Sequence, residues 1–188
     1  MLTPFQKQKL PLLFAVHDLN QDGVINRADF EEYSARIAST RGWGRDSAEY
    51  KELVNRFMTF WNGLEEVAKR KGARQVTVKE WLEDWDEILA SPKLYDQIVP
   101  PIGRAIFTVL DQNGDGAITA KEYAATFKYS GLDERNAAAA FARLDLDHDG
   151  QLTIDEFVTL AHQFFKSNNP ADPGNALFGV LPELKTPV

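Results

Sequence analysis

The sequence predicts an all-α fold in which four helix–loop–helix units form two pairs and pack into one compact globule. A short two-stranded β-ribbon is expected between the loops of each pair. The main observation behind this prediction is a twelve-residue pattern of oxygen-bearing side chains around a glycine, which occurs three times in the chain. In addition, apolar stretches typical of helices lie on both sides of each copy. The polar loops and their flanking helices together predict the architecture.

The loop at residues 145–156 carries the pattern in full. Carboxylates occupy its positions 1, 3, 5 and 12, and Gly150 occupies position 6. A Ca²⁺ ion binds about six to eight oxygen atoms, and alternate residues of a tightly curled loop can direct theirs to one centre. Glycine permits the sharp turn because it adopts positive φ at little cost. The expected ligands are Asp145, Asp147, Asp149, the backbone carbonyl of Gln151, Thr153 directly or through water, and Glu156 with two oxygens.

Two further loops, at residues 111–122 and 18–29, repeat this order. The loop at 111–122 matches the full EF-hand calcium pattern, and the loop at 18–29 departs from it only at position 12, where aspartate replaces glutamate. In the loop at 111–122 the expected ligands are Asp111, Asn113, Asp115, the carbonyl of Ala117, Thr119 and Glu122. In the loop at 18–29 they are Asp18, Asn20, Asp22, the carbonyl of Val24, Asn26 and Asp29.

The aspartate at position 12 distinguishes the loop at 18–29 from the other two. Asp29 is one carbon shorter than glutamate and is expected to reach the ion with a single oxygen. Magnesium prefers a smaller octahedral shell and takes fewer protein ligands. We therefore expect this loop to be the weakest calcium site or a site that exchanges Ca²⁺ with Mg²⁺.

A fourth, degenerate copy is predicted at residues 69–80, because EF-hand loops pair through position 8 and so occur in even numbers. Val76 takes position 8 of this copy, as Ile25, Ile118 and Leu152 do in the others. Lysines take positions 1 and 3, alanine position 5, and arginine replaces the glycine, at Lys69, Lys71, Ala73 and Arg74. Cations at ligand positions repel Ca²⁺, so no metal is expected there. The copies are called loops one to four in chain order.

Helices are expected on both sides of every loop. Thr3-Pro4 marks the first helix start, and Thr77 with Glu80 forms a capping box for the helix that reaches Ala90. The other helices are expected at 27–40, 46–69, 102–110, 121–129, 133–144 and 154–166, with prolines between 92 and 101 marking the connection between the two halves. An aromatic ring four residues before each intact loop and another directly after it are expected to meet where the two flanking helices cross.

The composition narrows the function classes. The chain has 188 residues, no cysteine and a formal net charge of −7. Disulfides are excluded, and the negative charge argues against a nucleic-acid partner. No apolar run approaches the roughly 20 residues of a membrane span, and the apolar N-terminal stretch leads directly into loop one rather than into a cleavage site. We expect a cytoplasmic monomer without a membrane span whose partners are calcium ions; whether it has a protein target is left open.

With these residues placed, the chain resembles the sarcoplasmic calcium-binding protein group, which includes calerythrin-like members and is related to the calcium-regulated photoproteins. Loops one, three and four are intact, loop two is degenerate, a long spacer separates the first two loops, and Asp172-Pro173 and Leu177-Phe178-Gly179 close the chain. The resemblance implies an N-terminal EF-hand pair at 1–91 and a C-terminal pair at 92–166, packed face to face. The tail at 167–188 is expected to dock on the body through Leu177, Phe178, Val180 and Leu181.

Several functions fit these features. The resemblance implies an intracellular Ca²⁺ buffer or transporter, and two methionines against twelve phenylalanines argue against the Met-rich groove of a calcium sensor. A sensor with a protein target is the alternative. A luciferin-binding protein or photoprotein is a further one, with a coelenterazine-type ligand among Trp61, Trp81, Trp85, His17 and His162. Enzymatic activity is not expected, since the chain lacks a cysteine nucleophile, a histidine-rich cluster and a glycine-rich phosphate loop.

Overall fold

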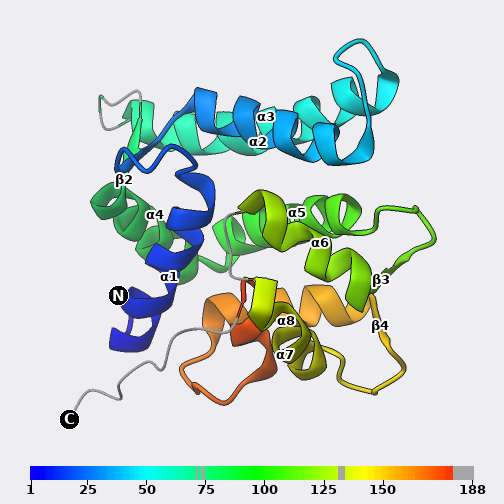
Figure 1. The fold of residues 1–188 in the computed structure, drawn as a ribbon. Coiled ribbons are helices and arrows are strands. Elements are labelled where there is room, and N and C mark those ends of the chain that lie inside the picture. Colours follow the sequence, from blue (N-terminus) through cyan, green and yellow to red (C-terminus); the bar gives the residue numbers. More distant parts are fainter. Residues whose placement is uncertain (71, 73–74, 131–133, 180–188) are drawn as a thin grey trace.

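The computed structural model describes residues 1–70, 72, 75–130 and 134–179, and Figure 1 shows the arrangement of its helices. In chain order the elements are α1 (Pro4–His17), β1 (Val24–Ile25), α2 (Arg27–Arg41), α3 (Ala48–Arg70), β2 (Val76–Thr77), α4 (Val78–Ala90), α5 (Pro92–Leu110), β3 (Ala117–Thr119), α6 (Ala120–Ser130), the 3₁₀ turn η1 (Glu134–Asn136), α7 (Ala137–Leu144), β4 (Gln151–Thr153), α8 (Ile154–Lys166) and the 3₁₀ turn η2 (Pro173–Ala176). The all-α fold of paired helix–loop–helix units is confirmed. None of the helices within the described ranges is both long and apolar enough to cross a membrane.

The paired loops are joined by two antiparallel ribbons. Strand β1 pairs with β2, and Ile25 lies opposite Val76. Strand β3 pairs with β4, and Ile118 lies opposite Leu152. These are the position-8 residues, so the predicted ribbons are confirmed, including the one that joins loop one to the degenerate loop two. Of the first three ligand positions of loop two, Lys71 and Ala73 lie outside the described residues, and Lys69 is described only by its backbone in α3.

The helices that leave the loops begin with capping boxes. The Thr77 hydroxyl accepts a hydrogen bond from the Glu80 amide, and the Glu80 carboxylate accepts one from the Thr77 amide. Thr153 with Glu156, and Asn26 with Asp29, form the same box at α8 and α2. Each pair occupies positions 9 and 12 of its loop. The residue that closes the loop therefore also starts the following helix.

Helix α5 corrects the prediction for the connection between the halves. The prolines were expected to interrupt the chain until residue 102, but α5 runs without a break from Pro92 to Leu110. Pro92 is at the first helical position, where proline is tolerated because its missing N–H would have no partner. Pro100 and Pro101 lie inside the helix, and burial of the neighbouring Val99 holds that stretch in the core. Packing overrides the proline signal here.

The helix before loop four also begins later than predicted. It was expected from residue 133, but residues 134–136 form the 3₁₀ turn η1, and α7 itself starts at Ala137. Asn136, which precedes α7, makes no side-chain capping bond. A run of alanines gives high helix propensity but carries no start signal, which explains why the boundary was misplaced.

The aromatic rings beside the loops meet across each pair rather than within one unit. Phe107, before loop three, contacts Phe157, after loop four, with ring centroids 5.8 Å apart. Tyr123, after loop three, contacts Phe141, before loop four, at 5.9 Å. In the N-terminal half, Phe14 meets Trp81 at 6.0 Å. The sequence prediction of rings meeting within a unit therefore needs correction: these contacts tie two neighbouring units together.

The tail turns back on the helices of the C-terminal half. Segment η2 packs against α7 and α8 at the end of the described chain (Figure 1). Leu177 is only 5% exposed, and the ring of Phe178 lies 4.8 Å from that of Phe164. Val180 and Leu181, which the sequence analysis also assigned to this contact, lie outside the described residues.

Candidate metal centres

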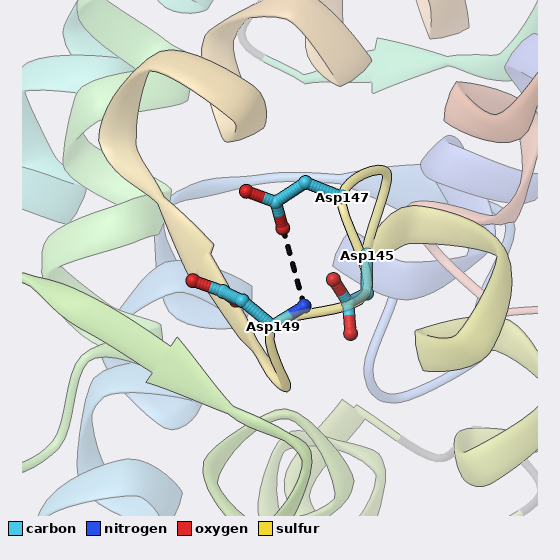
Figure 2. Close-up of side chains that lie close together, drawn as sticks. All are labelled: Asp145, Asp147 and Asp149. Carbon is cyan, nitrogen blue, oxygen red and sulfur yellow. Dashed lines mark hydrogen bonds between the residues drawn. The ribbon is translucent and has the colours of Figure 1, made fainter.

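Loop four brings its first three carboxylates together (Figure 2). Oxygens of Asp145, Asp147 and Asp149 all lie within 4.8 Å of one another. The loop backbone holds them: the amide of Asp149 donates to Asp147 Oδ1 at 3.3 Å, and the amide of Gln151 donates to Asp149 Oδ1 at 2.8 Å. Carboxylates with no cation between them repel. Their convergence therefore forms a centre suited to a positive ion.

Two carboxylate oxygens of loop four have unmet bonding capacity. Asp145 Oδ1 and Glu156 Oε1 are buried and accept no hydrogen bond. Their partner oxygens are engaged, since Asp145 Oδ2 accepts from the Gly150 amide at 3.0 Å and Glu156 Oε2 from the Thr153 amide at 2.9 Å. A buried charged oxygen without a partner is costly. An all-oxygen donor set with two such oxygens fits a hard divalent cation such as Ca²⁺.

Two residues with positive φ bend each intact loop. Position 6 is glycine throughout, with φ of 86° at Gly23, 90° at Gly116 and 86° at Gly150. Position 4 also has positive φ, yet it is Gln21 in loop one and His148 in loop four. Sequence reasoning identified the first bend and missed the second. Glutamine gives no signal for positive φ and histidine only a weak one, so the repeat of the same position across loops is the signal that could have indicated it.

Backbone amides also bond to the ligands of loop three, but there they engage both oxygens of the first and the last acid. Both oxygens of Asp111 accept amide bonds, from Gly114 at 2.7 Å and from Gly116 at 2.9 Å. Glu122 Oε1 accepts from the amide of Asn113 at 3.2 Å, and its Oε2 accepts from the Thr119 amide at 2.9 Å. Burial opposes ionisation of Glu122, but these hydrogen bonds outweigh it and lower the pKa of the carboxyl.

Loop one is closed by a more deeply buried and shorter acid. Asp18 accepts the amides of Asp22 at 3.1 Å and Gly23 at 3.0 Å, as the first residue of loop three does. Asp29 is 3% exposed, and its Oδ2 accepts from the Asn26 amide at 2.9 Å. Burial raises the pKa of Asp29, although the backbone bond from Asn26 partly offsets it. Its carboxylate is directed toward the start of α2.

The side chains at position 9 bond within their own loop or helix start. The Asn26 side-chain oxygen accepts from the Ala28 amide at 2.8 Å. The Thr119 and Thr153 hydroxyls donate to Oε2 of Glu122 and Glu156, each at 2.8 Å. The two threonine hydroxyls therefore orient the acid at position 12 of their loops. A contact between position 9 and the ion through a water is compatible with this arrangement.

Comparison with known proteins places this geometry in a family. The model of the EF-hand domain pair matches residues 102–162. The sarcoplasmic calcium-binding protein of Hediste diversicolor is 31% identical over 172 residues, which cover 91% of this chain and 94% of the relative. Calerythrin of Saccharopolyspora erythraea is 26% identical over 166 residues, covering 87% and 94%.

A solved structure agrees with the sequence relatives. A Streptomyces coelicolor calcium-binding protein, described in connection with prokaryotic calcium-mediated regulation, superposes with a TM-score of 0.70 at 26% identity. The match covers 85% of this chain and 97% of that protein. These relatives are calcium-binding proteins rather than enzymes. The chain is an EF-hand protein and belongs to the sarcoplasmic calcium-binding protein family.

Proposed function

We propose that this protein binds three Ca²⁺ ions, in loops one, three and four, and acts as an intracellular calcium buffer or transporter. The observation that carries the proposal is the oxygen centre of loop four, where three carboxylates converge and Asp145 Oδ1 and Glu156 Oε1 are buried without partners. Loops one and three repeat its positive-φ positions and its amide bonds to the first aspartate. The ligands are those expected from the sequence.

Loop one is proposed as the site that exchanges Ca²⁺ with Mg²⁺. Asp29 is short, buried and bonded to the Asn26 amide, so it supplies one oxygen to the ion rather than two. A shell with fewer protein oxygens, completed by water, suits Mg²⁺ better than Ca²⁺. Loop two is proposed to bind no metal, on the basis of Lys69 and Lys71 at its first two ligand positions.

The packing of the protein supports buffering rather than sensing. Sensor EF-hands open on calcium binding and present an adaptable Met-rich groove. In this chain, aromatic rings join the neighbouring units, Phe107 to Phe157 and Tyr123 to Phe141, and the tail packs against α7 and α8. A sensor with a protein target is the second candidate, favoured by the Streptomyces coelicolor protein and its connection with regulation.

A luciferin-binding role has less support from the interior. Trp61, Trp81 and Trp85 are buried in the core, and His162 is exposed. His17 lines a cavity of about 50 Å³ beside Phe57 and Ile106, and burial lowers its pKa to about 4. A drug-sized ligand needs roughly 300 Å³ or more. Absence of light emission after incubation with coelenterazine, followed by calcium, would remove the photoprotein alternative.

Isothermal titration calorimetry of the metal-free protein tests the proposed sites. We expect three Ca²⁺ ions per chain, with one of the three heats reduced when the titration is repeated in millimolar Mg²⁺. Four ions would contradict the assignment of loop two, and fewer than three would contradict that of loop one, three or four. Equal competition by Mg²⁺ at every site would contradict the special role of Asp29.

A further inference from the structure

The tail after α8 is held by polar contacts from three helices. Lys9 Nζ in α1 donates to Asn175 Oδ1 at 3.1 Å. The Tyr123 hydroxyl in α6 donates to the carbonyl of Ala176 at 2.9 Å. The Gly174 amide donates to the Gln163 side-chain oxygen in α8 at 2.9 Å. We call residues 173–177 the clasp, because they join the first unit of the chain to the third and fourth.

The clasp lies against α8 with no space to spare. A Cβ atom at Gly174 would lie 2.3 Å from the carbonyl oxygen of Leu160 and 2.6 Å from Cβ of Gln163. Both distances are well inside van der Waals contact, so only glycine permits this approach. Ala176 is fully buried beside it. The clasp is therefore closely packed against α8.

Lys9 is a buried cation that donates its hydrogen bonds to the clasp and to the end of α8. Its side chain is 0% exposed, and besides Asn175 it donates to the carbonyls of Ser167 at 2.8 Å and Gln163 at 3.5 Å. An ammonium group has three donors, so these acceptors satisfy it. The two carbonyls lie at the C-terminal end of α8, where the helix dipole favours a positive charge. Lys9 therefore fixes α1, the end of α8 and the clasp to one another.

Tyr123 links the clasp to a loop, because it directly follows Glu122 at position 12 of loop three. Glu122 faces the loop, with Oε1 accepting from the Gln112 amide at 3.0 Å. The adjacent Tyr123 side chain points to the tail, and its hydroxyl also reaches the Leu177 carbonyl at 3.2 Å. The turn of α6 that positions a metal ligand therefore also positions a tail contact.

We infer that calcium binding in loop three tightens the clasp through Tyr123. This inference rests on the calcium site proposed above for that loop. Without the cation, Glu122 is held by hydrogen bonds from loop amides and lacks the further contact that the ion would provide, so the start of α6 loosens. With the cation, Glu122 is fixed and so is the Tyr123 hydroxyl. Loading then holds Leu177 and Phe178 on the body, so calcium covers apolar surface that a sensor would uncover.

A single buried thiol measures opening of the clasp. The chain has no cysteine, so Ala176→Cys introduces one thiol at a fully buried position and leaves the backbone carbonyl that Tyr123 contacts. Its reaction rate with the disulfide reagent DTNB reports how often the clasp opens. We expect saturating calcium to slow the reaction about tenfold, within the usual range of coupling between two sites. Adding Tyr123→Phe should reduce this calcium effect to about twofold.

Tyr95→Phe is the matched control for Tyr123→Phe. It removes one hydroxyl, which contacts His162 Nδ1 at 3.0 Å, and should leave the calcium effect at tenfold. Equal thiol rates with and without calcium would overturn the inference, as would a calcium effect that Tyr123→Phe leaves unchanged. Hydrogen exchange of the Leu177 and Gly179 amides, bonded to the Gly174 and Ala176 carbonyls, gives the same test in the unmodified chain if Ala176→Cys fails to fold.

Calorimetry on the same samples separates this inference from the proposed function. If three ions bind and neither thiol rate nor hydrogen exchange responds to calcium, the coupling fails and the calcium sites stand. If Glu122→Gln removes no ion from the stoichiometry, the proposed site in loop three itself fails.

Discussion

Loops one and four carry acids of different length at position 12, Asp29 and Glu156. In loop four, Glu156 bonds to the start of α8 through Oε2 and keeps Oε1 buried without a partner. In loop one, Asp29 is drawn to the start of α2, where Oδ2 accepts from the Asn26 amide. Position 12 has two tasks, which are to cap the helix and to close the metal shell. We propose that glutamate reaches both, whereas the shorter aspartate serves the first at the expense of the second.

Removing the charge at position 12 of loop four should weaken the stronger of the two calcium sites. Glu156→Gln replaces the oxygen that completes the site by an amide and leaves a neutral group beside the three aspartates. We expect calcium affinity at loop four to fall on the order of a hundredfold, because affinity in these loops follows ligand charge and rigidity. Calorimetric titration should resolve the weakened site.

Asp155→Asn is the control, since it makes the same charge change at the exposed neighbouring residue. Its affinity should remain within about twofold of the unmodified protein, as expected for a screened surface charge. A similar loss in both variants would mean that net charge rather than coordination by Glu156 determines binding.

Lengthening the acid at position 12 of loop one should reduce the difference in calcium affinity between loops one and four. Asp29→Glu lets one oxygen keep the bond to the Asn26 amide while the other reaches the ion. We expect calcium affinity at loop one to rise about tenfold and competition by Mg²⁺ to weaken, because a second oxygen favours the larger ion. Calcium titrations with and without millimolar Mg²⁺ would measure both. Asp46→Glu, the same change at an exposed residue outside the loops, should alter neither; an unchanged loop one in Asp29→Glu would refute the two-task account.

Lys9 connects the helices that flank the two loops compared above. Its helix α1 leads into loop one, while its ammonium binds the end of α8, the helix that leaves loop four. Lys9→Met should lower the free energy of unfolding by about 1–3 kcal/mol at pH 7, because buried oxygens lose their donor. Urea unfolding in excess calcium would measure it. The exposed Lys7→Met should have little effect, and an equal loss there would contradict the role given to Lys9.

The difference in stability between the unmodified protein and Lys9→Met should depend on pH, and the pKa of Lys9 gives the sign of this dependence. Burial lowers the pKa of Lys9 to about 8 from 10.5, although the charge of Asp172 opposes the shift. Between these values the unfolded chain binds more protons at Lys9 than the folded protein does. The stability of the unmodified protein should therefore rise relative to Lys9→Met as pH increases from 8 to 10.5, by about 1 kcal/mol or more. A falling or flat difference would show that the ammonium is not shielded from water.

The sequence was sufficient where structure depends on residue type at fixed spacing. Asp145, Asp147 and Asp149 were predicted to converge and they do, and the Thr77–Glu80 box begins α4 as expected. Position 8 predicted both ribbons, including the one that uses the degenerate loop. Each of these signals is local, and chemistry alone gives the reason for it.

Apart from the start of α7 and the bend at position 4 of the loops, the failures involve contacts between distant segments. Pro100 and Pro101 look like an interruption until the packing of α5 is known. The ring of Phe107 meets Phe157 of the next unit, which spacing within one unit does not predict. Nothing in the sequence around Lys9 distinguishes it from a surface lysine. Its burial depends on carbonyls about 150 positions away, among them that of Gln163. Tertiary proximity of this kind leaves no local pattern.

The central claim is that the protein binds calcium and remains closed. A calcium titration in millimolar Mg²⁺, followed by the fluorescence of ANS, tests it most directly because ANS reports newly exposed apolar surface. The account predicts that emission falls or stays flat while three ions bind. A sharp rise in emission with calcium would contradict it, since the protein would then be presenting an apolar surface to a partner, as a sensor does.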